Sequence, residues 1–122
     1  MKSRPQSRRI RSDNINSARR NAREQAESYF LKGKESQSNA REQEALEFYI
    51  KATICDPSFY QVYCNMGSCF KVLGKYQESK NSYNRALAIC QNDLITNYNL
   101  ANLLRLIGDI DESIKHYKIV IK

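Results

Sequence analysis

The sequence predicts an all-α protein, a solenoid of about three stacked helix–turn–helix units behind a basic, largely disordered N-terminal tail. Two observations support this prediction. Residues of matching size recur every 34 positions, and the excess positive charge of the 122-residue chain lies at one end. Strands are not expected, because no segment alternates polar and apolar residues with a period of two.

The repeat becomes visible when the chain is compared with itself at a shift of 34 residues. Tyr49 aligns with Tyr83 and Tyr117, without insertion or deletion. These matches divide the chain into units 26–59, 60–93 and 94–122, of which the last is incomplete. The other matching columns stay small or stay large: Gly33/Gly67/Ala101, Ala40/Gly74/Gly108, Ala45/Ser79/Ser113, Ala52/Ala86/Val120 and Tyr29/Tyr63.

Each unit has the pattern of two helices. In residues 60–73 the large apolar side chains recur at spacings of three and four, as they do on one face of a helix. Gly74 follows, where a helix end favours a residue that adopts positive φ. Residues 77–90 repeat the helical spacing. Gly67 lies inside the first helix at a cost of about 1 kcal/mol relative to alanine, so we expect a bulky partner to pack closely against it.

This layout resembles the tetratricopeptide repeat, a 34-residue unit with an aromatic residue, Leu-Gly and Tyr, followed by Ala, an aromatic residue and Pro. The resemblance covers residues 26–122 and implies a right-handed α-solenoid. It also implies a concave groove, lined by the first helices, that binds proteins or peptides without catalysis, cofactor or metal. The matching residues are Tyr29, Gly33, Ala45, Tyr49, Ala52 and Pro57, then Tyr63, Gly67, Tyr83 and Ala86, then Leu100 and Tyr117.

The resemblance also assigns groove positions. The amides of Asn65 and Asn99 share one column and can pair with an extended peptide backbone, while Lys34 and other cations favour an acidic ligand. The alternative is that these are ordinary solvated side chains on a helix surface. The principal candidates are Lys34, Asn65, Ser68, Lys71, Tyr98, Asn99, Asn102 and Arg105; the same columns add Glu27, Phe30, Leu31, Gln37, Gln61, Cys64 and Ile95.

One ligand class of the family is disfavoured. Members that bind chaperone tails clamp a C-terminal carboxylate with a lysine at the fifth position of the first helix. In this chain that column holds Phe30, Cys64 and Tyr98.

Catalytic and metal-site patterns are missing from the sequence. There is no phosphate-binding G-x-x-x-x-G-K-[ST] segment, and His116 is the single histidine. The four cysteines, Cys55, Cys64, Cys69 and Cys90, contain no C-x-x-C pair and are expected to be reduced thiols. No apolar run approaches the roughly 18–20 residues of a membrane span, and no secretory signal follows the start. We therefore expect a cytoplasmic protein, with the nucleus as the alternative.

Two features depart from the repeat pattern. Ser36 occupies a column that holds Phe70 and Leu104, which indicates either an atypical terminal repeat or a first helix that frays or ends early. At the other end, no polar helix covers the last unit, so we expect Ile119 and Ile121 to be partly exposed. Self-association or a partner chain could cover that surface.

The tail carries most of the net charge. Residues 1–25 contain eight Lys/Arg and two Asp/Glu, a net +6, whereas residues 26–122 have a net +1. We expect at least residues 1–16 to be disordered, while residues 17–25 favour a backward extension of the first helix. Several interpretations of the tail stay open. It binds nucleic-acid phosphates or another acidic surface, it is a nuclear-localisation signal or a mitochondrial transit peptide, or it is a solvated extension. Its candidate contacts are Arg8, Arg9, Arg11, Arg19, Arg20 and Arg23.

These features favour a protein-interaction scaffold that binds a peptide segment in its groove. Two other functions remain open. One is a non-catalytic, substrate-recruiting module of a larger enzyme such as a glycosyltransferase, and the other is tail-driven binding of nucleic acid.

Overall fold

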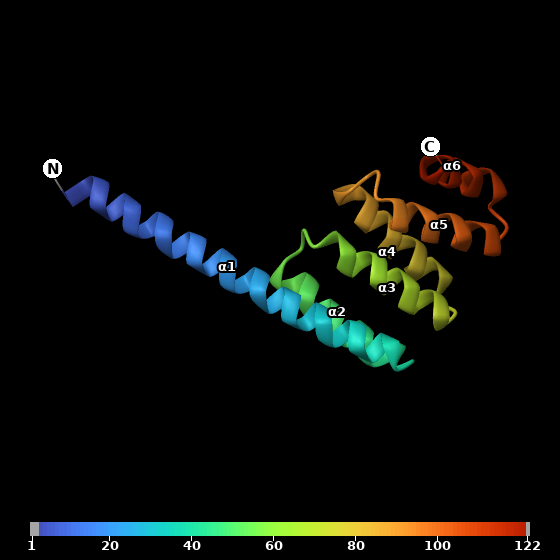
Figure 1. Ribbon diagram of the computed structural model, residues 1–122, viewed down its shortest axis with the longest axis horizontal. Helices are drawn as coiled ribbons and strands as arrows, with labels where there is room; N and C mark the ends of the chain where they lie inside the picture. The colour runs from blue at the N-terminus through green and yellow to red at the C-terminus, as the bar shows by residue number, and fades with distance from the viewer. Residues whose placement is uncertain (1–2, 122) are drawn as a thin grey trace.

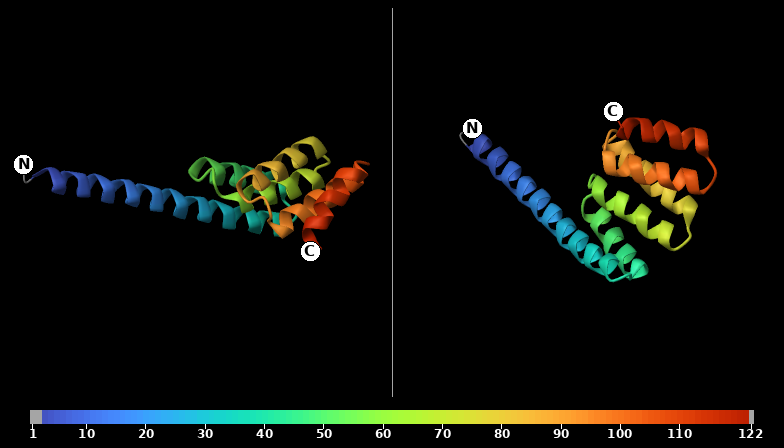
Figure 2. Two further views of the ribbon diagram at one scale, coloured as in Figure 1. Left: turned by 90° about the horizontal axis from the view of Figure 1, so that it is seen from above. Right: turned by 45° about the vertical axis from the view of Figure 1, so that its right-hand side comes forward.

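The computed structural model describes the backbone of residues 3–121 and the side chains of residues 13–121. This part of the chain is all helical and forms three helix pairs stacked side by side, as Figures 1 and 2 show. The predicted solenoid of helical hairpins is thereby confirmed. The helices are α1 (Ser3–Ser38), α2 (Glu42–Cys55), α3 (Tyr60–Val72), α4 (Tyr76–Ile89), α5 (Leu94–Leu106) and α6 (Ile110–Val120).

Packing within each pair depends on a small residue opposite a tyrosine. Tyr83 on α4 is fully buried against Gly67 on α3, and a Cβ on Gly67 would lie 2.6 Å from the Tyr83 ring. Gly33 and Tyr49 repeat this arrangement between α1 and α2. The Ser79 hydroxyl donates to the Gly67 carbonyl at 2.6 Å. The glycine therefore lets the two helices approach closely, as the sequence predicted.

Successive pairs share a continuous interior. α2 packs on α3 and α4 packs on α5, while α1 contacts α3 and α3 contacts α5. Leu46, Phe59 and Val62 are buried where the first two pairs meet, and Leu100 and Leu103 are buried where the second pair meets the third. The first helices, α1, α3 and α5, thus form one layer of the stack.

The turn inside each pair uses the same backbone geometry. Ala40, Gly74 and Gly108 all have positive φ, at 59°, 76° and 90°. After α3, the N–H of Gly74 donates to the Lys71 carbonyl, and the next N–H donates to the Phe70 carbonyl. The other two turns contain the equivalent bonds. These bonds satisfy carbonyl groups at the helix end and reverse the chain.

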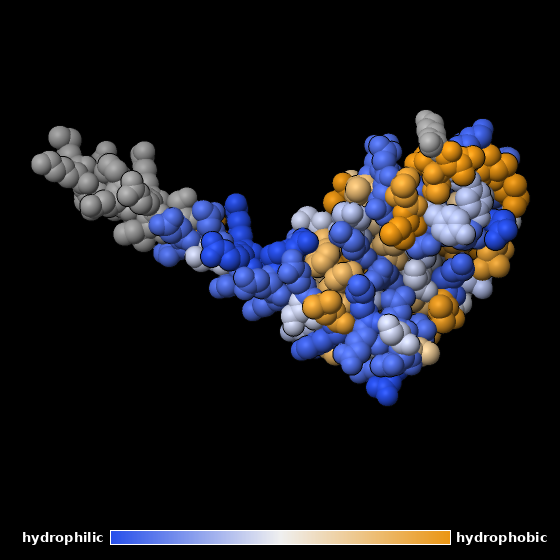
Figure 3. Space-filling view, viewed as in Figure 1, coloured by the Kyte–Doolittle hydropathy of each residue, from blue (hydrophilic) through white to orange (hydrophobic). Residues whose placement is uncertain are grey.

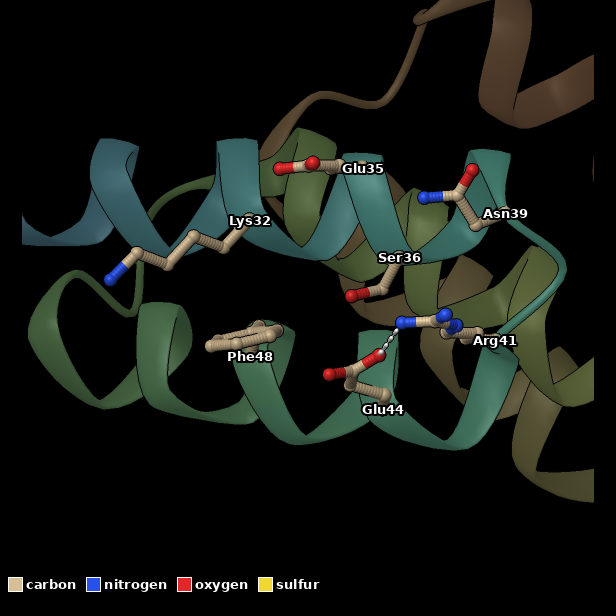
Figure 4. Close-up of a pocket in the computed structure, with 7 residues that line it drawn as sticks. All are labelled: Lys32, Glu35, Ser36, Asn39, Arg41, Glu44 and Phe48. Carbon is tan, nitrogen blue, oxygen red and sulfur yellow. Dashed lines mark ion pairs between the residues drawn. The ribbon is translucent and has the colours of Figure 1, made fainter.

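Ser36 does not shorten the first helix. α1 ends at Ser38, the same place in its unit as Val72 and Leu106, so the alternative in which it frays or ends early is wrong. Packing of Gly33 against Tyr49 and the shared turn geometry hold its last turns. The small side chain instead leaves a hollow of about 210 Å³ between α1 and α2, shown in Figure 4, where an Arg41–Glu44 ion pair lies beside it.

The basic segment lies at the start of α1, which begins at Ser3, and its separation from the folded stack (Figure 1) agrees with the predicted tail. The extension expected for residues 17–25 is present, and the backbone is continuous across residue 25. Residues 13–21 are nevertheless exposed on all faces of the helix, and Figure 1 shows this part extending away from the stack. A helix without packing is only marginally stable in water, and no side chain of residues 13–21 is buried against the stack.

Apolar side chains are exposed at the last pair. Ile121 is 79% exposed, Ile110 and Ile114 are about half exposed, and Ile119 is half-buried, so the predicted partial exposure of Ile119 and Ile121 is confirmed. Figure 3 shows apolar surface gathered over this end. Among the described helices, none is both long enough and apolar enough to cross a membrane.

Candidate functional site

Two adjacent hollows lie on the layer formed by α1, α3 and α5. The first has a volume of about 280 Å³, and its lining includes Phe30 from α1 and Ile95 from α5. The second hollow, of about 290 Å³, lies toward the end of α1. Lys34 and Asn65 line both. The full linings are Phe30, Lys34, Tyr60, Gln61, Cys64, Asn65, Asp93 and Ile95 for the first, and Lys34, Gln37, Ser38 and Asn65 for the second.

Tyrosine hydroxyls reach this layer from the second helices. The Tyr49 hydroxyl donates to Gln37 Oε1 at 2.6 Å and accepts from Asn65 Nδ2 at 3.3 Å. Burial raises the pKa of Tyr49 to about 12, although the bond from Asn65 acts in the opposite direction. The phenol therefore remains protonated at physiological pH and fixes the positions of two predicted groove residues.

The other two tyrosines of the column contact predicted groove residues in the same way. Tyr83 and Ser68 share a hydrogen bond of 3.0 Å, and the Tyr117 hydroxyl donates to Asn102 Oδ1. From the sequence, these tyrosines were expected only to pack, and their hydroxyl bonds were missed. The signal was available, because a buried tyrosine needs a hydrogen-bond partner that phenylalanine does not.

The two predicted amides retain capacity for a ligand. Asn65 uses one Nδ2 hydrogen on Tyr49, which leaves a second N–H and a carbonyl oxygen. Asn99 Nδ2 lies 3.8 Å from the sulfur of Cys64, a weak acceptor. Both amides can therefore form new hydrogen bonds without breaking a strong one.

Charged and aromatic candidates are distributed along the layer. Lys34 is exposed, with Nζ 5.3 Å from the centre of the Phe30 ring. Tyr98 is about half exposed and stacks edge-on against Tyr117. Lys71 and Arg105 lie in the last turns of α3 and α5, and neither lines the two hollows. Of the principal candidates, only Lys34 and Asn65 are brought together in these hollows. Ser38, Tyr60 and Asp93 line the hollows without having been predicted.

The basic residues have different surroundings. Arg19 and Arg20 are exposed on α1, whereas the side chains of Arg8, Arg9 and Arg11 lie outside the described residues. Arg23 binds Asp56 at 2.6 Å, and its guanidinium lies 3.9 Å from the centre of the Phe59 ring. Arg23 thus attaches α1 to the loop that follows α2.

The cysteines and the histidine are buried or half-buried among the helices. Cys64 and Cys69 are buried, and burial raises the pKa of the Cys69 thiol to about 12. His116 Nδ1 lies 2.9 Å from Asn97 Oδ1. Over the described side chains, no group of three His, Cys, Asp or Glu residues is arranged to hold a metal ion.

Comparison with known proteins identifies the family. The family model described as tetratricopeptide repeat matches residues 60–93, the span of the second expected unit. The uncharacterized protein MJ0572 of Methanocaldococcus jannaschii is 31% identical over 64 residues, which cover 52% of this chain and 74% of that protein. The chain belongs to the tetratricopeptide-repeat family. Its helical hairpins are therefore tetratricopeptide repeats.

A solved structure shares the fold of this tetratricopeptide-repeat chain. The second TPR of Spaghetti (RPAP3), bound to the HSP90 peptide SRMEEVD, superposes with a TM-score of 0.82 at 17% identity, covering 86% of this chain and 96% of that one.

A further similarity is to a much longer protein. Protein O-mannosyl-transferase TMTC1 of Mus musculus is 32% identical over 81 residues, or 66% of this chain. The chain spans 9% of the mouse protein's length.

Proposed function

We propose that this tetratricopeptide-repeat chain is a protein-interaction module that binds an extended peptide segment across α1, α3 and α5. The observation that supports this most directly is the pair of neighbouring hollows that share Lys34 and Asn65. An extended segment that crosses both hollows passes these two side chains. Asn65 offers a donor and an acceptor to the peptide backbone, and Lys34 offers a positive charge.

The lining favours a segment with both acidic and apolar side chains. Lys34 can pair with a carboxylate, while Phe30 and the exposed Ile95 provide apolar contact. The related fold of Spaghetti holds an HSP90 peptide that contains acidic residues. In our proposal the ligand of this chain is a different one, because Phe30, Cys64 and Tyr98 occupy the column of the carboxylate-clamping lysine.

Selection from a random library tests this function even though the partner is unidentified. Random, unstructured peptides displayed on phage would be selected on the immobilised full chain, and a labelled selected peptide would then be titrated by fluorescence anisotropy. We expect Asn65→Ala and Lys34→Ala each to weaken binding by about tenfold, since each removes one polar contact worth about 1–1.5 kcal/mol. Raised salt should weaken binding to the wild type more than binding to Lys34→Ala.

The matched control is Asn81→Ala, which removes an exposed asparagine from α4, outside both hollows. We expect this variant to bind the selected peptide like the wild type. Equal affinity in the wild type, Asn65→Ala and Lys34→Ala would contradict the proposed groove. Failure to select any peptide would also contradict it.

A second candidate function is substrate recruitment within a glycosyltransferase. The 32% identity between this chain and part of a mouse protein O-mannosyl-transferase favours this function. The same selection discriminates between the two functions: enrichment of Ser/Thr-rich acceptor-like segments would support recruitment, whereas enrichment of acidic segments would support the scaffold.

A further inference from the structure

The third repeat lacks an aromatic ring that the first two contain. Tyr29 and Tyr63 occupy one column of the repeat, and Asn97 occupies it in the third unit. Tyr63 is buried, and its hydroxyl donates to the carbonyl of Pro57 at 3.1 Å. The Arg85 guanidinium lies 4.6 Å from the centre of its ring. In the second unit, therefore, the Tyr63 ring fills the space beside Pro57 and Arg85.

Asn97 replaces the hydrogen bond of the tyrosine but not its volume. Asn97 is fully buried, and its Nδ2 donates to the carbonyls of Gln91 and Asp93 at 3.1 and 2.9 Å. Gln91 stands in the column of Pro57, so the amide takes over the carbonyl bond that anchors Tyr63 one unit earlier. Since both N–H groups are used, Asn97 Oδ1 accepts from His116, whose Nδ1 carries the proton.

The missing ring leaves a hollow of about 460 Å³ between α4 and α6. Its apolar lining comes from Leu87, Ala88 and Ile119. Ile119 stands in the column of Arg85, so the cation that covers the ring of Tyr63 is also replaced by an apolar side chain. The volume lies within the range of small-molecule sites. The hollow is built mainly on second helices of the repeats, whereas the proposed groove is built on first helices.

We propose that this hollow is a second interaction site, which binds an aromatic side chain of a partner protein. The same position one repeat earlier holds a tyrosine ring, so the backbone around it already suits a flat ring of that size. Leu87 and Ile119 provide the apolar contact, and the buried Asn97 and the half-buried His116, which share a hydrogen bond, provide the polar lining. A buried aromatic side chain typically anchors an interface, because it removes a large apolar area from water. This site does not depend on the groove.

Methyl and imidazole NMR spectra test the site directly, with N-acetyl-tryptophanamide as the probe. We expect saturable shifts of the Leu87 and Ile119 methyl signals and of the His116 ring, at millimolar probe concentration. N-acetyl-alaninamide is the matched probe without a ring and should leave these signals unmoved.

Two variants fill the hollow by different routes. Asn97→Tyr restores the ring of the earlier repeats, and Ala88→Phe adds a ring from an exposed position without altering a buried bond. Each should weaken probe binding at least about tenfold, corresponding to about 1.4 kcal/mol, while circular dichroism shows retained helix. Ala88→Phe keeps the test valid if Asn97→Tyr fails to fold. Asn81→Ala, at an exposed position of α4 that does not line the hollow, should bind the probe like the wild type.

Two results would overturn the proposal. One is that the tryptophan probe leaves the Leu87 and Ile119 signals unmoved, or moves them equally in the wild type and Ala88→Phe. The other is a concentration-dependent dimer in sedimentation that Ala88→Phe dissociates, because the occupant would then be a second copy of the chain. Loss of peptide binding at Lys34 and Asn65 would leave the outcome unchanged, so the two proposals fail separately.

Discussion

One added carbon on Gly67 would force two helices apart. Its Cβ would meet three carbons of the Tyr83 ring at 2.6–2.8 Å, and that ring is fully buried. The third repeat shows how the packing yields, because Ala101 replaces glycine there and Tyr117 is only half-buried. The glycine is thus required where the tyrosine is held completely inside.

We expect Gly67→Ala to destabilise the fold by up to about 2 kcal/mol. Overpacking costs about 1–3 kcal/mol, and the better helix propensity of alanine returns about 1 kcal/mol. Urea unfolding followed by circular dichroism measures the difference. A double variant with Tyr83→Leu should lose less than the sum of the single losses, because the two residues are in contact. An additive double variant would contradict the proposed clash.

His116 makes the stability depend on pH. Burial lowers the pKa of His116 below its ordinary value of 6.5; Lys115 acts in the same direction, and Glu112 opposes it. The unfolded chain therefore binds a proton more readily than the folded chain when the pH falls below about 7. We expect the free energy of unfolding to decrease as the pH is lowered from 7.5 to 5.5.

His116→Gln is the matched control for this titration. Glutamine can still donate to Asn97 but does not titrate in this range, so its unfolding free energy should change less between pH 7.5 and 5.5. Chemical denaturation at several pH values measures both proteins. An equal slope for the two would show that His116 is not the titrating group.

The turn after α1 contains a local strain that the other two turns avoid. Ala40 adopts a φ of 59°, where Gly74 and Gly108 adopt similar values without a side chain. Left-handed backbone costs an L-residue about 1–2 kcal/mol. Ala40→Gly removes this cost, but glycine gains more entropy than alanine when the chain unfolds, which offsets part of the gain. We therefore expect Ala40→Gly to stabilise the protein by about 0.5–1 kcal/mol. Thermal unfolding measures the gain.

Gly74→Ala is the reverse experiment. A Cβ on Gly74 would meet no atom within 4 Å, so its effect comes from φ alone. We expect a loss of about 1 kcal/mol. If Ala40→Gly lowers the stability, or Gly74→Ala raises it, the turn geometry does not control the helix ends in this way.

The sequence predicted the elements well because their signals are local or periodic. Small residues opposite Tyr49 and Tyr83, and glycines at the turns, require only the 34-residue comparison and the steric properties of glycine. The start of α1 could not be predicted in the same way. Its first part lacks an apolar face, and the long helix in the structure buries no side chain over residues 13–21.

The sites were less predictable because they depend on contacts between distant side chains. The Asn97–His116 pair joins residues 19 positions apart, and neither residue fits a repeat signal. Similarly, the columns suggested Asn65, but its bond to Tyr49 follows from the depth at which the tyrosine is buried. Periodicity identifies which residues share a face; rotamers and burial decide which of them touch.

The stack as a whole should be most stable in its middle. α3 and α4 are packed between two neighbouring pairs, whereas α1–α2 and α5–α6 each have a neighbour on one side. In repeat proteins stability is approximately the sum of each unit and its nearest-neighbour interfaces. Amide hydrogen exchange should therefore be slowest in α3 and α4, faster in α6 and fastest in residues 13–21 of α1.

Arg23 tests how strongly α1 is attached to this stack. Burial works to raise the pKa of Asp56, but hydrogen bonds from Ser58 and Arg23 outweigh it and hold the pKa below its ordinary value. Arg23→Gln removes the ion pair and the contact with Phe59. We expect exchange to become faster in α1 between residues 20 and 30 and to stay unchanged in α5, because coupling passes only between neighbouring units. Arg19→Gln, at an exposed position, is the control. Uniformly faster exchange through all six helices would instead mean that the stack unfolds as a single cooperative unit.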